Sequence, residues 1–362
     1  MELLVVMVII LAIWVRPMMS TATAAQYVDI YRVRKMAADH NVTCVLVFGD
    51  SSVDPGNNNI LDTTFKGNFP PYGKDFFNGK PTGRFSNGRL PTDFIAEALG
   101  YTKLIPGYLQ PKLRKKNLLH GVSFASAASG YDDLTANITN VLPVSKQLQY
   151  LSHYKTRLGG LVGEKRAEQI IRDAIFVISM GTNDFIQNYY IELVRAKQFT
   201  VEEYGDYLAT SMMKDIKEMH RIGARRVVVV GVPPLGCMPL VKTLRDTTFC
   251  DPMYNHAALS FNNKIKAKLA TLKISLGMTG LYVDAYGIIQ SAVNNPIKYG
   301  FTESSKGCCG TGTIEYGDTC KDLSTCKDPS KYVFWDAVHP TERMYKIIAD
   351  EALSSLNTGF LD

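Results

Sequence analysis

The sequence predicts an α/β fold, in which one mostly parallel sheet carries helices on both faces. Five short apolar runs rich in β-branched residues are typical of strands that are covered on both sides and need not alternate. Helical patterns lie between these runs, and such an alternation of strand and helix favours a parallel sheet. No internal repeat or low-complexity linker divides the 362 residues, and 46% of them are hydrophobic, so we expect a single domain over residues 26–362.

The expected elements can be placed in order along the chain. Strands are expected at residues 42–48, 118–124, 174–180, 226–232 and 280–285. Helices are expected at residues 90–100, 143–160, 201–224, 255–276 and 340–356, several of which end near a glycine or begin near a proline. The connecting segments 54–89, 103–117 and 294–331 are too long for plain turns, and we expect them to form the walls of a substrate cleft.

The first 25 residues are typical of a signal peptide. An apolar stretch at residues 3–15 is followed by small residues in an Ala-Thr-Ala pattern at 22–24. Its thirteen apolar residues are fewer than the ~20 that span a bilayer, so we expect cleavage near Ala24 or Ala25 and secretion to the extracellular space. A retained anchor is the alternative, because Glu2 offsets the positive charge of the amino terminus.

Secretion would place the seven cysteines in an oxidising compartment, where disulfides persist. Cys44 lies in a predicted core strand and is expected to be a buried free thiol. The other six are expected to form disulfides of open connectivity: Cys237, Cys250, Cys308, Cys309, Cys320 and Cys326. Zinc binding is the alternative, but two adjacent cysteines do not match the Cys-x-x-Cys spacing of common structural zinc sites. The sequons at Asn41 and Asn137 agree with export and are candidate glycosylation sites.

The basic residues do not indicate a nucleic-acid partner. The formal net charge of +6 is spread thinly, and the densest basic stretch, "PKLRKK" at residues 111–116, is typical of a solvated loop. No alternation of stacking aromatic and basic residues accompanies it.

The main candidate for a reacting group is Ser51, which follows the first apolar run in "VLVFGDSS". Open α/β sheets place reacting groups at the carboxyl ends of their strands, and a serine nucleophile there needs a base and an acid that orients it. His339 precedes a predicted helix and has Asp336 three residues upstream, so the carboxylate can accept the Nδ1 proton while Nε2 faces the serine. Alone, Asp-x-x-His is also an ordinary capping turn. Five histidines are assigned to surface or packing roles: His40, His120, His153, His220 and His256.

Two further segments end predicted strands and offer donors for an oxyanion. Asn183 in "SMGTNDF" carries an amide suited to this role, although a helix cap is the simpler interpretation of that residue alone. The small residues of "HGVSFASAASGYDD" let backbone N–H groups approach a ligand closely.

Four segments in this order, "FGDSSVD", "GVSFASAASG", "GTNDF" and "DAVHP", resemble the four blocks of the GDSL or SGNH hydrolase superfamily. The details "FPPYGKDF", "PTGRFSNGR", "VPPLGCMP" and "CCGTG" resemble its secreted plant GDSL esterase/lipase branch, and the match extends from about residue 42 onward. The resemblance implies a flavodoxin-like three-layer α/β/α fold with strand order 2-1-3-4-5, and a serine hydrolase of carboxylic esters. No metal or organic cofactor is expected.

The resemblance also implies a role for each motif residue. Ser51 takes the position of the nucleophile, Asp336 and His339 take the other triad positions, and Asn183 takes that of the oxyanion-hole asparagine. The N–H of Ser51 and a backbone N–H of the second block, assigned to Ala127, are the remaining oxyanion donors.

The second block departs from the usual pattern of the family. Ser123 replaces an asparagine, and Ala127 and Ala128 stand where glycines are common. An alanine keeps the backbone N–H that the oxyanion needs, so we expect activity to survive. The role of Ser123 in packing or in fixing the loop stays open.

Other functions stay open beside ester hydrolysis. An α/β-hydrolase with Ser123 in a nucleophile elbow requires Gly-x-Ser-x-Gly, a pattern that Ala125 breaks. The same triad could serve an acyltransferase or a polysaccharide acetylesterase, and a binding protein without catalysis is the last alternative. The expected partner is a small-molecule or lipid ester, bound by a monomer that has no integral membrane association once the signal peptide is removed.

Overall fold

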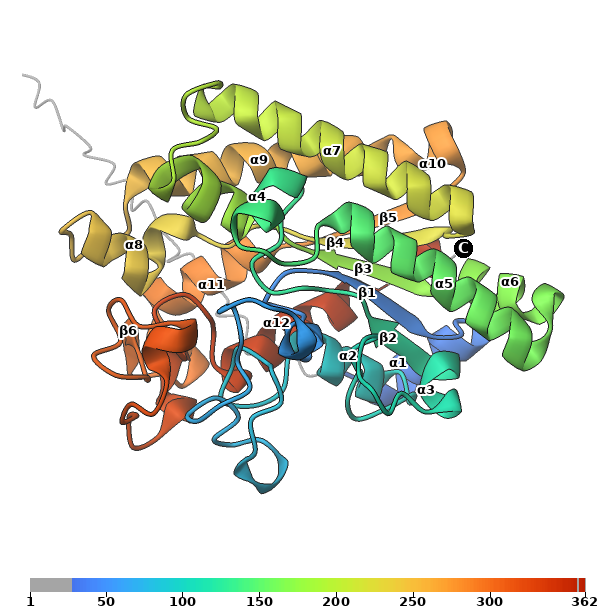
Figure 1. Cartoon of the computed structure of the whole chain (residues 1–362), viewed down its shortest axis with the longest axis horizontal. Coiled ribbons are helices and arrows are strands. Elements are labelled where there is room, and N and C mark those ends of the chain that lie inside the picture. Colours follow the sequence, from blue (N-terminus) through green and yellow to red (C-terminus); the bar gives the residue numbers. More distant parts are fainter. Residues whose placement is uncertain (1–27, 357, 362) are drawn as a thin grey trace, which may run out of the picture.

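A computed structural model describes residues 28–356 and 358–361 (Figure 1). The predicted signal peptide and its cleavage site lie outside these residues. No helix within the described part of the chain is long and apolar enough to cross a membrane.

The central sheet contains five parallel strands in the order β2-β1-β3-β4-β5, as the family resemblance implied. The strands are β1 (Val45–Gly49), β2 (Gly121–Ser123), β3 (Ile175–Ser179), β4 (Arg226–Val230) and β5 (Thr279–Val283). Strands β1 and β3 are buried along their whole length, which explains why their sequences do not alternate. Because β1 and β3 are neighbours, the residues that follow them meet at one edge of the sheet.

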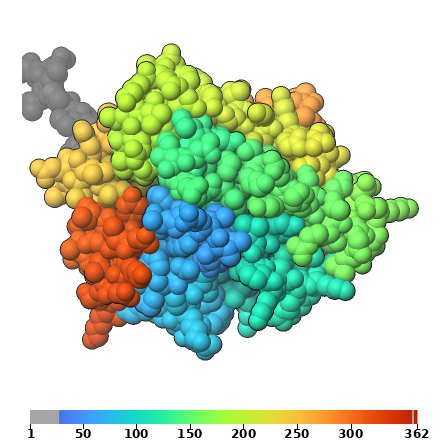
Figure 2. Space-filling model, in the orientation of Figure 1, coloured from blue at the N-terminus to red at the C-terminus, as the bar shows by residue number. Residues whose placement is uncertain are grey.

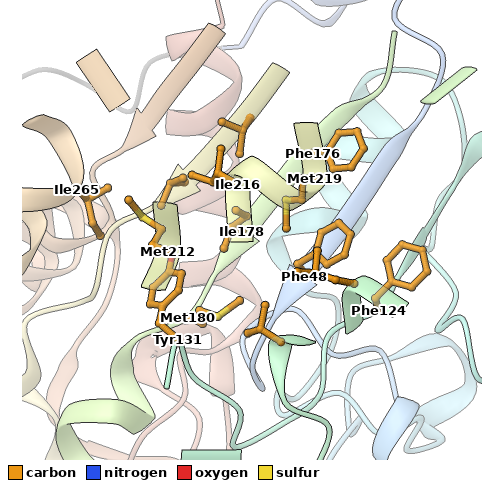
Figure 3. Close-up of a cluster of buried hydrophobic side chains, with 14 of the residues drawn as sticks. Phe48, Phe124, Tyr131, Phe176, Ile178, Met180, Met212, Ile216, Met219 and Ile265 are labelled. Carbon is orange, nitrogen blue, oxygen red and sulfur yellow. The ribbon is translucent and has the colours of Figure 1, made fainter. Parts of the chain in front are cut away.

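Helices cover both faces of this sheet and form a three-layer sandwich (Figure 1). One layer consists of α5 (Val144–Val162), α7 (Val201–Ile222) and α9 (Pro252–Ala270), and the opposite layer of α1 (Ile30–Asp39), α2 (Pro91–Ala98) and α12 (Glu342–Ser355). Figure 3 shows the first interface, in which Phe176 and Ile178 from the sheet lie near Ile216 and Met219 of α7. The intervening strand residues point to the second layer, so the sheet is apolar on both faces.

Shorter elements complete the fold, and many of them lie at the carboxyl ends of the strands. The helices are α3 (Lys115–His120), α4 (Asp133–Ile138), α6 (Glu164–Arg172), α8 (Pro239–Leu244), α10 (Leu272–Leu276), α11 (Ala285–Asn294), α13 (Thr358–Leu361) and the π-helix η3 (Asp184–Ile191). A separate two-stranded parallel sheet pairs β6 (Glu303–Gly307) with β7 (Tyr332–Phe334). Strand β7 leads directly into the segment that contains Asp336 and His339.

Three expected boundaries were wrong. The second strand is only three residues long, because residues 118–120 belong to helix α3 and Gly121, at φ +119°, ends the helix and begins the strand. Helix α12 begins after Thr341, whose hydroxyl accepts the N–H of Met344, while Pro340 pairs with the end of β7. The helix expected at 255–276 starts earlier and divides at Thr271 into α9 and α10.

The six cysteines that were predicted to pair form three disulfides. These are Cys237–Cys250, Cys308–Cys326 and Cys309–Cys320, and Cys44 is a buried free thiol, as expected. The paired sulfur atoms are therefore not available as zinc ligands. Two of the disulfides close residues 308–326, called here the disulfide lobe. Figure 2 shows the orange-red surface near residue 310 packed against blue surface from residues 50–90.

Candidate active site

Ser51 lies immediately beyond the carboxyl end of β1. Gly49 ends this strand with φ +152°, and a Cβ built on it would lie 2.1 Å from the carbonyl oxygen of Ser179 in the neighbouring strand. Only glycine fits this close approach. The N–H of Asp50 donates to the same Ser179 oxygen at 3.0 Å, so the backbone of β3 fixes the start of the turn that carries Ser51.

The structure brings Ser51, His339 and Asp336 together, although 288 positions separate the serine from the histidine. Nε2 of His339 lies 2.8 Å from Oγ of Ser51, and Nδ1 lies 2.8 and 2.9 Å from the two carboxylate oxygens of Asp336. With Nδ1 donating to the carboxylate, Nε2 is the acceptor for the serine proton. Phe85 packs against the imidazole, with ring centroids 4.9 Å apart.

Asp336 is held by its own turn. Its Oδ1 accepts the backbone N–H of Val338 at 2.8 Å and that of His339 at 2.7 Å. The carboxylate is fully buried, and it also accepts the hydroxyl proton of Tyr72. Sequence reasoning gave Tyr72 no role, although it lies in the "FPPYGKDF" segment that contributed to the resemblance. The only sequence signal for Tyr72 was therefore membership of that motif.

Asn183 follows β3 and lies beside Ser51, but it does not cap the helix that begins after it. Its side chain makes no capping hydrogen bond; Nδ2 donates instead to the carbonyl of Ser129 at 2.9 Å. A second contact, to Oδ2 of Asp50, is 3.5 Å long, at the limit of a hydrogen bond. One N–H of the amide is therefore weakly engaged, and Asn183 lines the same space as Ser51.

The neighbouring Asp184 fixes the segment that receives Asn183, a role that sequence reasoning missed. Its buried carboxylate accepts the N–H groups of Tyr131 at 2.8 Å and Asp132 at 3.1 Å, and the hydroxyl of Thr135 at 2.6 Å. Burial raises its pKa to about 7, even though these donors favour the ionised form.

The backbone N–H of Ala127, which was expected to be an oxyanion donor, already donates to a side chain. This N–H donates to Oδ2 of the buried Asp54 at 3.0 Å and is therefore engaged. The next residue, Ala128, has φ +69°, and within the described residues neither its N–H nor that of Ser51 has a protein acceptor. Ala128 lines the same cavity as Ser51 and Asn183.

The expectation for residues 54–89 implied that the asparagines after Ser51 form the outer wall of a cleft. The structure instead buries two of them, Asn57 and Asn58, which are each only 1% exposed. Asn57 Nδ2 donates to the carbonyls of Ser123 at 2.9 Å and Ala125 at 2.7 Å, and Asn58 Nδ2 donates to that of Ala127 at 3.0 Å. These side chains satisfy the polar backbone of a buried loop and fix its path next to Ser51.

Ser123 has a loop-fixing role, which answers the question that its substitution raised. Its hydroxyl donates to the carbonyl of Val53 at 2.9 Å and accepts the N–H of Ala125 at 3.2 Å. Ser123 is fully buried and does not contact His339. This environment does not fit a nucleophile elbow.

Two largely apolar cavities, of about 70 and 30 Å³, lie beside the Ser51–His339 pair. Both share Ser51, Asn183 and His339 as lining residues. The larger cavity is lined by apolar side chains that include Val230, Val232, Met238, Ile289 and Ile348. The smaller cavity is lined by side chains that include Phe65, Phe85, Ile186, Leu240 and Tyr316.

The expected cleft walls are therefore present only in part. The segments 54–89 and 294–331 contribute Phe65, Phe85 and Tyr316, but no residue of the segment 103–117 lines either cavity. That segment instead pairs with the edge of β2, where the N–H of Tyr108 donates to the carbonyl of Ser123 at 2.8 Å.

A second carboxyl group, that of Asp50, lies next to Ser51 and lines the larger cavity. Burial raises the pKa of Asp50 to about 6, although the N–H and hydroxyl of Ser52 donate to its Oδ1 at 2.9 and 2.7 Å. The site therefore contains two carboxyl groups: that of Asp336 contacts the imidazole of His339, and that of Asp50 lies next to Ser51.

The sequence model of the GDSL-like Lipase/Acylhydrolase family matches residues 45–352. A GDSL esterase/lipase of Arabidopsis thaliana is 57% identical over 333 residues, which cover 92% of this chain and 93% of the relative. The GDSL esterase/lipase APG of the same plant is 44% identical over 314 residues, covering 85% and 89%.

Among solved structures, a lipase from a goat rumen metagenome gives a TM-score of 0.41 at 12% identity, covering 87% of this chain and 98% of that one. A mutant of an acetyl-xylooligosaccharide esterase from Geobacillus gives 0.39 at 13% identity, covering 86% and 93%.

Proposed function

The chain belongs to the GDSL-like lipase/acylhydrolase family and is a carboxylic ester hydrolase, and from this premise we propose that it acts through a Ser51–His339–Asp336 triad and an acyl-enzyme. The observation that carries the proposal is the continuous line of hydrogen bonds from the buried Asp336 carboxylate through the imidazole to Ser51 Oγ. Each link is 2.8 Å long, within the distance that proton transfer requires.

In the acylation step, Oγ of Ser51 attacks the ester carbonyl carbon while Nε2 of His339 takes the hydroxyl proton. The imidazolium that forms is stabilised by the Asp336 carboxylate, which also fixes the tautomer that presents Nε2 as a base. The C–O bond to the alcohol then breaks, and Nε2 returns the proton to the departing alkoxide. Water enters next and attacks the acyl carbon while Nε2 takes one of its protons. The bond between the acyl carbon and Oγ of Ser51 then breaks, Nε2 returns the proton to Oγ, and the acid leaves.

The negative charge of the tetrahedral intermediate forms next to Ser51, and it needs hydrogen-bond donors there. One cavity is lined by Ser51, Ala128 and Asn183. We assign the oxyanion to the backbone N–H groups of Ser51 and Ala128 and to the weakly engaged side-chain N–H of Asn183. Donors fixed in advance stabilise the transition state without a reorganisation cost. The Asp54–Ala127 hydrogen bond supports this arrangement because it fixes the residue that precedes Ala128.

The two cavities suit the two arms of an ester. Because both open beside Ser51, one can receive the acyl chain and the other the alcohol. Their apolar walls favour hydrocarbon over polar groups. This property fits small-molecule or lipid esters.

We also propose that the protein is secreted and glycosylated. Three disulfides support an oxidising compartment, and the side chains of Asn41 and Asn137 are exposed. Expression of the full chain in a secretory host should release protein with one free thiol, that of Cys44. Protein retained on the membrane would instead favour an uncleaved anchor.

Substitution of the nucleophile tests the proposed chemistry. Ser51→Ala should abolish hydrolysis of p-nitrophenyl esters and leave the melting temperature close to that of the parent, because the hydroxyl contributes little packing. Near-normal activity would exclude Ser51 as the nucleophile. Adding alcohol acceptors to the parent enzyme distinguishes an acyltransferase from a hydrolase. If ester products exceed free acid even in dilute alcohol, the enzyme transfers the acyl group to the alcohol.

A further inference from the structure

Tyr72 connects the acid of the proposed triad to a distant part of the chain. Its side chain is 1% exposed, and its hydroxyl donates to Oδ2 of Asp336 at 2.7 Å. The hydroxyl oxygen of Tyr72 in turn accepts the N–H of Gly317 at 2.7 Å. We propose that Tyr72 is a positioning residue that fixes the Asp336 carboxylate and thereby sets the basicity of His339. This inference rests on the proposed triad.

The direction of the two hydrogen bonds follows from the donors. A phenol carries one proton, and the backbone N–H of Gly317 can only donate, so the Tyr72 proton is directed to Asp336. Burial and the negative charge of Asp336 raise the pKa of Tyr72 well above its ordinary value. The hydroxyl therefore stays a donor over the whole pH range in which esterases are assayed.

The hydroxyl occupies the one carboxylate oxygen that the local turn leaves without a backbone donor. Oδ1 accepts the N–H groups of Val338 and His339, whereas among the described residues Oδ2 has only Tyr72 and the imidazole as partners. Without Tyr72, Oδ2 would face the imidazole alone. The carboxylate would then be more basic and its orientation less fixed, since a hydrogen bond to the charged form stabilises that form.

The ring of Tyr72 is held independently of its hydroxyl. It makes edge contacts with Phe85 and Trp335, with ring centroids 5.5 and 6.3 Å apart, and Phe85 in turn packs on His339. A phenylalanine at position 72 would keep these contacts. Tyr72→Phe therefore removes the hydrogen bonds while preserving the packing.

In Tyr72→Phe, catalysis should change because the imidazole of His339 holds its proton more strongly. Without the Tyr72 hydrogen bond, the negative charge of the Asp336 carboxylate acts more fully on the imidazolium, so the protonated form of His339 should be more stable in Tyr72→Phe than in the parent. The acid limb of the kcat/KM profile should move to higher pH, by about 0.5 to 1 unit, because His339 must be neutral to accept the serine proton. We expect kcat to fall about tenfold or more, with little change in KM, since Tyr72 lines neither cavity.

Tyr154→Phe provides the matched control. Tyr154 is fully buried, donates its hydroxyl to the backbone carbonyl of Leu118, and lines neither cavity beside Ser51. Both variants lose one buried phenol that makes a hydrogen bond, and both should melt at a lower temperature than the parent. Only Tyr72→Phe should change kcat and the acid limb, with rates normalised to active sites titrated by a fluorophosphonate.

A double-mutant cycle separates this inference from the proposed function. In an Asp336→Ala background, Tyr72→Phe should cause no further loss of kcat, because its target is absent. Equal losses in both backgrounds, or an unchanged pH profile in the single variant, would overturn the positioning role while leaving the triad intact. Full activity of Asp336→Ala itself would instead overturn the triad.

Discussion

Ser51 and the Asp336–His339 turn lie at the same edge of the molecule, but the contacts that hold them come from different distances along the chain. Ser51 follows strand β1 of the central sheet. The loop beside it is fixed by Asp54, Asn57 and Asn58, which lie within eight residues of Ser51. The acid and base follow the short strand β7, which belongs to a separate sheet. Their supports are Tyr72, 264 positions away, and the disulfide lobe.

This difference teaches that the nucleophile depends on the sheet and the base depends on a covalently closed lobe. The N–H groups of Cys308 and Cys309 donate to the carbonyl of Trp335, the residue before Asp336, at 2.8 and 2.9 Å. Loss of the lobe should therefore displace the acid and the base while Ser51 keeps its place. Changes on the serine side should act on the oxyanion or on stability without moving the imidazole.

Among the variants that compare the supports of the two regions, the largest effect is expected at Asn183, next to Ser51. Removing one oxyanion donor costs about 2.7 to 4 kcal/mol of transition-state stabilisation, which corresponds to roughly a hundred- to a thousandfold in turnover. Asn183→Ala should therefore lower kcat with little change in KM and keep the parent pH profile. Steady-state kinetics across pH would check this. A rise in KM alone would make Asn183 a substrate-binding residue instead.

The second prediction concerns kcat after removal of one of two disulfides that close loops of similar length. Cys309–Cys320 closes the lobe beside Asp336, with a separation of 11 residues, and Cys237–Cys250 joins the start of α8 to the start of α9, with a separation of 13. Replacing either pair by serines should reduce the free energy of unfolding by about 3 kcal/mol. Only the lobe variant should also lose several-fold in kcat, measured well below its melting temperature. Equal losses of kcat in both variants would contradict a special link between the lobe and the base.

The smallest effect concerns the pH dependence of stability. Burial raises the pKa of Asp50 to about 6 from an ordinary value of 3.8, whereas hydrogen bonds from Thr311 and nearby N–H groups outweigh burial at Glu315 of the lobe and lower its pKa to about 2. The stabilisation from Asp50 is complete below about pH 4 and is lost as the pH rises through about 6, because folding disfavours its charged form. Glu315 acts in the opposite direction: its contribution is present above its unfolded pKa and is lost as the pH falls through about 2.

Asp50→Asn isolates the contribution of the serine side. An asparagine keeps Oδ1 as an acceptor for Ser52 but cannot ionise. Relative to the parent, its free energy of unfolding should rise between pH 4 and 7, by about 1 to 3 kcal/mol. Denaturant titrations at several pH values measure this difference. A difference that does not vary with pH would show that Asp50 is not titrating in this range.

Much of the fold and of the proposed triad could be predicted because the signals are local. The runs around Val47, Val177 and Val228 are apolar throughout and became the central strands, and Asp336 and His339 lie close enough in sequence to share one turn. The second strand was misplaced because the apolar residues Leu118 and Leu119 are equally suited to a helix, and only Gly121 marks the change.

The missed features depend on contacts that no local pattern contains. The N–H of Ala127 could not be assigned from sequence, because its acceptor lies 73 positions away on Asp54. Burial of the polar Asn57 and Asn58 likewise follows from the loop carbonyls that they satisfy. The disulfide connectivity and the Tyr72–Asp336 contact required the chain to be folded before they could be seen.

The central claim is that His339 activates Ser51 for attack, and covalent labelling of the native enzyme tests it most directly. A fluorophosphonate should add once per chain, and peptide mapping should locate the adduct on Ser51, within 2.8 Å of the activating Nε2. His339→Ala should label at least a hundredfold more slowly, because it lacks the base that removes the serine proton. An adduct on Ser123, no adduct, or an unchanged labelling rate in His339→Ala would contradict the account.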